Sequence, residues 1–362
     1  MRAGEERSGA LVRVMVVFGG RSGEHEVSLA SARAITQALE KSGRYEVVPV
    51  GITREGRWIS SGEPMRELES EAGYLPDGSN LDISGPPAST TEKLPAGLAS
   101  VDVVFPVLHG PYGEDGTIQG MLELAGVPYV GSGVLGSAAG MDKPTMKKIF
   151  AHHNLPQVRW VSMTSNQLKK NRKARIEEIE NSLGYPCFVK PANLGSSVGI
   201  GKAENAEELG DALDTASRFD RRIIVEEGVD AREIEVSVLG NEDPEVSVPG
   251  EIVIKKGDFY DYEAKYVEGG MELAVPAPIE DETTEEIRRI ASAAYEAIDA
   301  AGMARVDFFL ERGTDRLLLN EINTIPGFTP TSVYAELWST SGLPYEELLD
   351  RLVQLALERH GG

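Results

Sequence analysis

The chain has 362 residues, and at about 150 residues per domain this length predicts two or three domains. Its composition, 41% hydrophobic and 26% charged, excludes collagen-like and wholly disordered proteins. The 36 basic and 58 acidic side chains give a net charge of -22, which argues against a nucleic-acid partner because such a surface needs clustered Lys and Arg. The single cysteine, Cys187, excludes an intramolecular disulfide and a metal site built from cysteines.

The N-terminus gives no sign of a targeting segment. Residues Met1 to Ala10 are polar and contain no apolar stretch of the signal-peptide type. Later apolar runs are too short to span a bilayer, so we expect a soluble, cytoplasmic protein with no membrane partner. Cys187 lies in an apolar run and is expected to be a buried structural thiol rather than a nucleophile.

The first part of the chain predicts strands that alternate with helices. An apolar run from Leu11 to Phe18 predicts a buried strand, and Ser28 is the expected N-cap of the helix that follows. Later elements are expected at residues 46–52 (strand), 101–108 (strand) and 117–124 (helix). The Pro-, Gly- and Ser-rich stretch 60–100 is expected to be a loose surface insertion. Such alternation indicates an open parallel sheet that binds ligands at the carboxyl ends of its strands.

From Asp142 the pattern changes to basic helices and shorter strands. Asp142 is the expected N-cap of a helix with Pro144 in its first turn. Further helices are expected at 172–183, from 206, at 280–301 and after Pro344, and strands at 187–190, 222–226, 233–239 and 251–255. Residues 258–270 read as a loop. Two strands, 305–310 and 317–322, are expected to form a hairpin.

That hairpin carries the most informative polar residues of the sequence. Arg305 and Asp307 share one face of the first strand, and Glu321 and Asn323 share one face of the second. If the strands pair, two carboxylates and an amide oxygen converge, which suits Mg²⁺, and Arg305 can stabilise developing negative charge. The alternative is a solvated hairpin face with an ion pair.

A second candidate is Lys190, which ends an apolar strand and is followed by the glycine-serine loop Gly195 to Gly199. A cation beside free backbone amides can bind a phosphate, although an ordinary turn is equally compatible with the sequence. The loop does not match the Walker A pattern. We expect an exposed Lys190 that contributes little to stability.

Weaker signals follow three other strands. Glu26 lies where the first strand leads into the first helix, and His109 directly follows a later strand beside a glycine-rich loop. Residues Glu226 to Val229 end a strand, where backbone amides and carbonyls could read the edge of an adenine. None of these signals is specific by itself.

Together these motifs resemble the D-alanine–D-alanine ligases, members of the ATP-grasp superfamily. The matching runs are His109-Gly-Pro-Tyr-Gly-Glu-Asp-Gly116, Lys190-Pro191 with Gly195 to Gly199, Phe259-Tyr-Asp-Tyr-Glu-Ala-Lys-Tyr266, Arg305-Val-Asp307 and Asn320-Glu-Ile-Asn-Thr-Ile-Pro-Gly327. The resemblance implies an α/β protein of three-domain ATP-grasp architecture. Its domains would be an N-terminal open parallel sheet (1–131, with the 60–100 insertion), a central lid domain (132–226) and a C-terminal domain (227–362).

The resemblance also implies roles for individual residues. ATP would be bound by Lys143, Lys190, Ser197, Glu226, Glu227, Val229, Glu233, Lys265 and Asn320. Two Mg²⁺ ions, which Mn²⁺ can replace, would be bound by Asp307, Glu321 and Asn323. The D-alanine substrates would meet Glu26, His109, Tyr260, Arg305, Ser332 and Val333. Catalysis would involve Glu26, Ser196, Arg305, Tyr266 and the amide of Gly327. Glu227 departs from the family, where lysine is frequent.

The implied reaction is the ATP-dependent ligation of two D-alanine molecules through an acyl phosphate, for bacterial peptidoglycan synthesis, by a homodimer. One alternative is a related ligase that takes D-lactate or D-serine as second substrate, and Tyr266 argues against D-lactate. The other is a nucleotide-binding sensor without catalysis. The complete set of Arg305, Asp307, Glu321 and Asn323 argues against a sensor, because binding alone needs neither a second metal ion nor an oxyanion donor.

Overall fold

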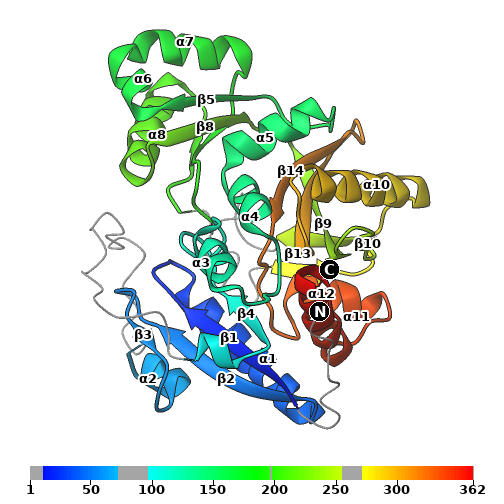
Figure 1. Ribbon diagram of the computed structural model, residues 1–362. Helices are drawn as coiled ribbons and strands as arrows, with labels where there is room; N and C mark the ends of the chain where they lie inside the picture. The colour runs from blue at the N-terminus through cyan, green and yellow to red at the C-terminus, as the bar shows by residue number, and fades with distance from the viewer. Residues whose placement is uncertain (1–10, 72–96, 196–197, 255–270, 362) are drawn as a thin grey trace.

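The computed structural model describes residues 11–71, 97–195, 198–254 and 271–361 (Figure 1). Over these ranges the strands form three sheets, each with its own helices. In Figure 1 the sheet with β1 lies at the bottom, the sheet with β5 and β8 at the top, and the sheet with β9, β13 and β14 beside them. No helix in the described ranges is both long and apolar enough to cross a membrane.

The N-terminal sheet has the order β3-β2-β1-β4. The central strand β1 (Val12–Gly19) pairs in parallel with β2 (Tyr45–Ile52) and β4 (Val103–Val107), and β3 (Trp58–Ile59) adds an antiparallel edge. Its helices are α1 (His25–Ser42), α2 (Pro64–Glu71) and α3 (Thr117–Ala125). The predicted parallel sheet is thereby confirmed, and the loops after β1 and β4 leave its carboxyl edge together.

One prediction about this sheet's surroundings is wrong, and another needs a correction at the two ends of its segment. Ser28 is not the N-cap of α1, which begins at His25. Instead the buried Ser28 hydroxyl accepts a hydrogen bond from the amide of Gly19 (2.7 Å) and donates to the carbonyl of Val107, so it joins β1 to β4. The 60–100 stretch is not wholly loose, because α2 and a 3₁₀ turn (Leu98–Ser100) occupy its ends and Leu68 is fully buried. Residues 72–96 lie outside the described ranges.

The central sheet is antiparallel, with the order β5-β8-β6-β7. Its strands are β5 (Trp160–Thr164), β6 (Cys187–Pro191), β7 (Gly201–Ala203) and β8 (Arg222–Glu227). The helices α6 (Ser165–Lys170), α7 (Arg172–Ser182) and α8 (Ala206–Phe219) accompany it. Cys187 is buried in this core, where desolvation raises its thiol pKa to about 11, so the predicted structural thiol is confirmed.

The C-terminal sheet has the order β12-β11-β9-β13-β14, with β10 paired to β9. Its strands are β9 (Ala231–Gly240), β10 (Glu245–Val246), β11 (Gly250–Ile254), β12 (Met271–Ala274), β13 (Gly302–Glu311) and β14 (Leu317–Asn323). Helix α10 (Asp281–Ala297) is shorter than the predicted 280–301. It ends where Asp299 adopts a φ of 59° and Gly302 starts β13.

Helices also pack across the boundaries between sheets. Helices α4 (Val134–Met141) and α5 (Lys143–His152) bury residues in the core beside α10 and the C-terminal sheet. Helices α11 (Val333–Thr340) and α12 (Tyr345–Gly361) share a core with the N-terminal sheet, where Leu348 and Leu352 lie in the same cluster as Val14. The proposed domain limits at 131 and 226 stay predictions.

Candidate active site

The centre of the site lies on β13, where Arg305 and Asp307 point to the same face. The guanidinium of Arg305 donates two hydrogen bonds to the Asp307 carboxylate, both 2.7 Å long. Its Nε also lies 2.9 Å from Oε2 of Glu235 on the neighbouring strand β9. Asp307 is 8% exposed and Glu235 2%, so this hairpin face is buried rather than solvated. A guanidinium held between two carboxylates has a fixed direction, as an oxyanion donor requires.

Strand β14 supplies the opposite half of the site. The predicted hairpin is confirmed, and it is antiparallel with Asp307 opposite Glu321 and Arg305 opposite Asn323. The register shifts after Asp307, because Leu319 faces Phe308, and Asn320 is therefore the extra residue of a β-bulge. Because of this bulge, Asn320 has no residue opposite it on β13, while Glu321 still lies opposite Asp307.

Asp307, Glu321 and Asn323 together fit a hard cation such as Mg²⁺, because all their donor atoms are oxygens. Each carboxylate already has a cation of the chain nearby: Arg305 binds Asp307, and Nζ of Lys143 lies 3.3 Å from Oε2 of Glu321. Over the described ranges no group of three or more His, Cys, Asp and Glu side chains could hold a metal. The predicted set differs from such a group, since its third member is an amide.

Two lysines from different elements meet at one buried carboxylate, Glu226 at the end of β8. Nζ of Lys190 lies 2.6 Å from its Oε2, and Nζ of Lys147 lies 2.9 Å from its Oε1. Lys147 also donates to the carbonyl of Asn320 (3.3 Å) and is only 1% exposed. Burial alone would raise the pKa of Glu226, but the two lysines outweigh burial and lower it to about 2.

The expectation of an exposed, structurally neutral Lys190 is therefore wrong. Its side chain is 12% exposed and forms a short ion pair. Burial by itself lowers the lysine's pKa, but the negative charges of Glu226, Glu321 and Glu233 raise it above the ordinary value. Lys190 consequently stays charged, which a phosphate-binding role needs.

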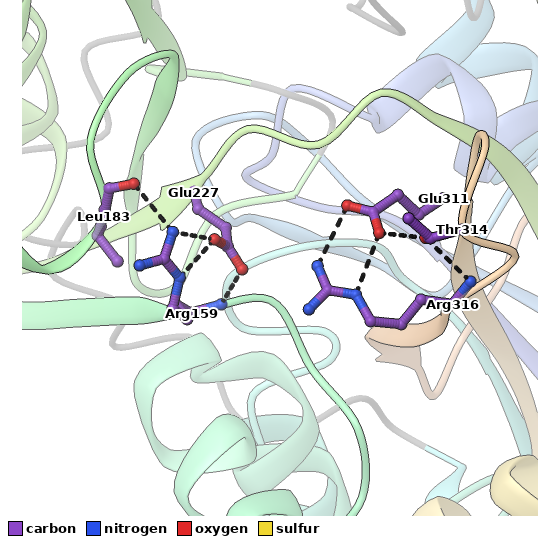
Figure 2. A network of polar contacts seen from close by, with 6 residues as sticks. All are labelled: Arg159, Leu183, Glu227, Glu311, Thr314 and Arg316. Carbon is purple, nitrogen blue, oxygen red and sulfur yellow. Dashed lines mark hydrogen bonds and ion pairs between the residues drawn. The ribbon is translucent and has the colours of Figure 1, made fainter.

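The residues predicted around an adenine occupy the turn after β8. The Glu226 side chain is committed to the lysines, which leaves only its backbone for a base. Glu227 is held by Arg159, whose Nε donates to Oε2 at 2.6 Å and whose amide donates to Oε1 at 2.7 Å (Figure 2). Figure 2 also shows the pair Glu311–Arg316, which closes the β13–β14 turn with Thr314. Val229 follows β8 half-buried, and Glu233 lies on β9 opposite Phe309.

A cavity of about 560 Å³ lies between the N-terminal sheet and β13–β14. The following predicted residues line it: Glu26, His109, Gly195, Arg305, Glu321, Asn323, Gly327, Ser332 and Val333. Residues from both ends of the chain therefore meet in one cavity, whose size suits small-molecule ligands.

The N-terminal wall of this cavity is acidic. Glu26 forms an ion pair with Arg54, while Glu24 and Glu114 line the cavity beside His109. Burial, followed by the nearby Glu24, raises the pKa of Glu114 to about 8, and its carboxyl accepts a hydrogen bond from the amide of Gly110. Burial lowers the pKa of His109 against the opposing effect of Glu24, so its imidazole is neutral at pH 7. His109 Nδ1 lies 2.9 Å from the carbonyl oxygen of Ile325.

The other wall is the loop between β14 and α11. The Ser332 hydroxyl accepts a hydrogen bond from the amide of Thr329 (2.9 Å) and lies 2.8 Å from that residue's hydroxyl. Ser332 precedes α11 and Val333 begins it, so amides at the N-terminus of this helix face the cavity side of the loop. Such a terminus suits a carboxylate.

Five predicted site residues lie outside the described residues: Ser196, Ser197, Tyr260, Lys265 and Tyr266. Their assigned roles stay predictions. Three further residues of the site were not predicted to belong to it: Glu114, Lys147 and Glu235. Glu114 lies inside a matching motif, and Lys147 lies one helical turn after Lys143, so both had a sequence signal; Glu235, in an otherwise apolar strand, had only its polarity.

Family models agree with this arrangement along almost the whole chain. The model described as D-ala D-ala ligase N-terminus matches residues 13–132, and the one described as D-ala D-ala ligase C-terminus matches residues 149–354.

The chain belongs to the D-alanine–D-alanine ligase family.

Similar proteins of this family cover the same length. The D-alanine–D-alanine ligase of Bacillus cytotoxicus is 49% identical over 353 residues, 96% of each chain. That of Thermoanaerobacter pseudethanolicus is 51% identical over 354 residues, 96% of this chain and 97% of the other.

Solved structures give the same result. The D-alanine–D-alanine ligase from Coxiella burnetii has a TM-score of 0.78 at 33% identity and covers 97% of this chain and 95% of its own. The VanG D-Ala:D-Ser ligase from Enterococcus faecalis has a TM-score of 0.80 at 34% identity, with 96% and 100% covered. The predicted three-part ATP-grasp fold class is confirmed.

Proposed function

We propose that this protein uses ATP to join two D-alanine molecules into D-alanyl-D-alanine for peptidoglycan synthesis, releasing ADP and phosphate. The observation that carries the proposal is the single cavity in which Arg305, Glu321 and Asn323 meet Glu26 and His109. The sequence likeness to ligases of this name, about half of all residues over nearly the full length, supports it.

The chemistry begins with a carboxylate, which is a poor electrophile. The first D-alanine would place its ammonium on the acidic wall near Glu26 and its carboxylate toward the ATP γ-phosphate. Lys143 and Lys190 would bind the phosphates, whose negative charge they complement. Attack of the carboxylate oxygen on the γ-phosphorus breaks its bond to the β-phosphate oxygen and gives an acyl phosphate and ADP.

The second step forms the peptide bond. The second D-alanine would bind its carboxylate at Ser332 and the N-terminus of α11, and its neutral amine would attack the acyl carbon. Arg305 and the amide of Gly327 would stabilise the oxyanion until phosphate leaves. Because Glu235 and Asp307 fix the guanidinium in direction, no reorganisation is needed as the charge develops.

Asp307, Glu321 and Asn323 would hold Mg²⁺, which neutralises phosphate charge when bound. In the structure, Lys143 lies beside Glu321 and Arg305 beside Asp307, so these cations balance the carboxylates that would hold the metal ion.

The test is direct detection of product by mass spectrometry from ATP, Mg²⁺ and D-alanine, with L-alanine, D-lactate and D-serine as competitors. We expect D-alanyl-D-alanine and equimolar phosphate, and neither without Mg²⁺ or D-alanine. ATP turnover that is equal with and without D-alanine would contradict the proposal.

A second acceptor is the competing proposal, because one similar structure is that of a D-Ala:D-Ser ligase. Preferential incorporation of D-serine over D-alanine in the competition would favour it. Dominant D-lactate incorporation would contradict the role assigned to Tyr266.

A further inference from the structure

A second cavity, of about 320 Å³, lies at the carboxyl edge of the N-terminal sheet. It is bordered by Gly19 and Gly20 after β1, by Ile52 at the end of β2, and by Leu108 after β4. Helix α3 closes it with Ile118 and Met121, and Trp58 adds an aromatic wall. None of the residues assigned above to ATP, Mg²⁺ or oxyanion binding lines it. Open α/β sheets bind ligands at this edge.

We propose that this cavity binds a neutral, flat aromatic molecule of one or two rings, and that its occupancy strengthens D-alanine binding in the neighbouring active site. The second part rests on the proposed function, whereas the first part does not.

The walls argue for the aromatic class. Trp58, Leu108, Ile118 and Met121 present rings, methyl groups and a thioether, which pack well against flat rings. The volume is at the lower end of the range typical of small-molecule sites, about 300–1,000 Å³.

The rim argues for a neutral ligand. Among the described residues, the cavity rim has one positively charged side chain, Arg21, and one negatively charged side chain, Glu55, so the formal charge of the rim is zero. The Arg21 guanidinium lies 5.4 Å from the centre of the Tyr112 ring. Tyr112 is 47% exposed and has a φ of 68°, an uncommon conformation for a non-glycine residue, so the loop holds this ring at the rim against local strain.

The loop that bears Tyr112 also connects the two cavities. His109 lines both of them. Pro111, Tyr112 and Gly113 line the small cavity, and Glu114 lines the large one. Hydrogen bonds fix this loop, from the Glu114 amide to the Gly110 carbonyl (2.9 Å) and from Gln119 to the Gly113 carbonyl (2.8 Å).

This shared loop sets the sign of the coupling. Both cavities are open in one and the same loop conformation, so a molecule in the small cavity stabilises the conformation that also holds the large cavity open. Binding at either place then lowers the cost of ordering the loop for the other, and the coupling is positive and reciprocal.

The probe is 5-fluoroindole, added to the full-length protein and followed by fluorine NMR and calorimetry. We expect one bound probe per chain with a dissociation constant between about 10 µM and 1 mM, which is ordinary for a ligand of ten heavy atoms. Saturating probe should lower the dissociation constant of D-alanine about threefold or more, and D-alanine should strengthen probe binding by the same factor.

Two variants on α3 form the matched test. Met121→Trp fills the cavity from α3 and should weaken probe binding at least tenfold, with D-alanine binding unchanged in the absence of probe. Leu124→Trp adds the same ring to the same helix at a position that is 93% exposed, and should bind the probe like wild type. Trp58→Ala, which removes the aromatic wall, should also weaken binding and serves if Met121→Trp does not fold.

Four outcomes count against the proposal. Absence of probe binding, or equal binding by Met121→Trp and wild type, would refute the site. Displacement of the probe by ADP would assign it to the nucleotide site instead. Probe binding with no change in D-alanine affinity would refute the coupling through the loop, and because all these readouts are binding measurements, they stand apart from whether dipeptide is formed.

Discussion

Glu226 and Glu114 are two buried carboxyl groups on opposite sides of the active-site region, and they are kept in opposite protonation states. Glu226 is 3% exposed and bound by two lysines, which hold its pKa near 2. Glu114 is 6% exposed, and burial together with the nearby Glu24 raises its pKa to about 8. Similar burial therefore leaves Glu226 ionised on the nucleotide side and Glu114 neutral on the amino-acid side. The charges of the neighbouring side chains determine the protonation state of each carboxyl group.

The difference suits the two proposed ligands. On the nucleotide side the ionised Glu226 keeps Lys190 charged and in place for phosphates, and it also balances the charge of the buried Lys147. On the amino-acid side Arg54 pairs with Glu26 and Glu114 is neutral, which leaves Glu24 as the carboxylate that a single ammonium group can balance. Replacing each carboxyl group by an amide in turn tests this comparison.

The largest expected effect is that of Glu226→Gln. It leaves Lys147 buried without a counter-charge, and removing one partner of a buried ion pair costs about 3–5 kcal/mol. We expect a loss of that size in the free energy of unfolding at pH 7, measured by urea denaturation. The double variant Glu226→Gln/Lys147→Met should regain part of it, because the uncompensated charge is gone. An unchanged stability of the single variant would contradict the buried lysine–carboxylate cluster.

Glu114→Gln tests whether Glu114 is protonated in the folded protein. The folded protein binds the Glu114 proton more tightly than the unfolded chain, whose carboxyl has the ordinary pKa of 4.5, so wild-type stability falls as the pH rises from about 4.5 to about 8. Glutamine keeps the acceptor for the Gly110 amide but cannot ionise. Relative to wild type, the variant should therefore gain at least about 1 kcal/mol of unfolding free energy between pH 5 and 8. A constant difference across this range would show that Glu114 is ionised in the folded protein.

Glu226 should give the opposite pH dependence. Its pKa is lowered on folding, so its stabilisation is present above about pH 4.5 and is lost as the pH falls toward 2. The stability difference between wild type and Glu226→Gln should therefore shrink on acidification from pH 5 to about pH 3, where denaturant titrations of both proteins can be compared. If the stability difference between wild type and Glu226→Gln instead grew on acidification, the lowered pKa would belong to another group.

The smallest effect is expected for Glu227→Gln, the sequence neighbour of Glu226. Its partner Arg159 is 62% exposed, and ion pairs open to solvent contribute about 1 kcal/mol or less. Urea denaturation at pH 7 should thus separate the two neighbouring glutamates clearly. A loss as large as that of Glu226→Gln would mean that the Arg159 contacts drawn in Figure 2 anchor the turn after β8.

The sequence predicted the parts of the site that depend on local pattern. Strand alternation placed Arg305 and Asp307 on one face, and the hairpin signal paired them with Asn323 and Glu321. Glycine-rich runs after strands drew attention to the loops that bear His109 and Gly195, and both residues line the cavity.

What it could not give are contacts between distant segments. Lys147 and Glu226 are far apart in the chain, and nothing local requires them to meet. The same is true of Glu235, which reaches Arg305 only because β9 pairs with β13. Ser28 was expected to cap a helix because serine favours that position, but the gap between β1 and β4 offered its hydroxyl two backbone partners instead. Protonation of Glu114 likewise depends on burial, which tertiary packing determines.

The packing of α12 against the first sheet has a consequence for synthesis on the ribosome. Leu348, Leu352 and Val353 complete the core that begins with β1, and Arg359 donates hydrogen bonds to the carbonyls of Tyr129 and Gly131. The N-terminal sheet emerges first, whereas α12 emerges only after the strands of the central and C-terminal sheets. At typical elongation rates of about 5–20 residues per second, the roughly 230 residues after Gly131 delay that helix by some 10–50 seconds. During this interval α1 covers only part of the apolar face of the nascent sheet, and the part that α12 buries stays exposed to solvent.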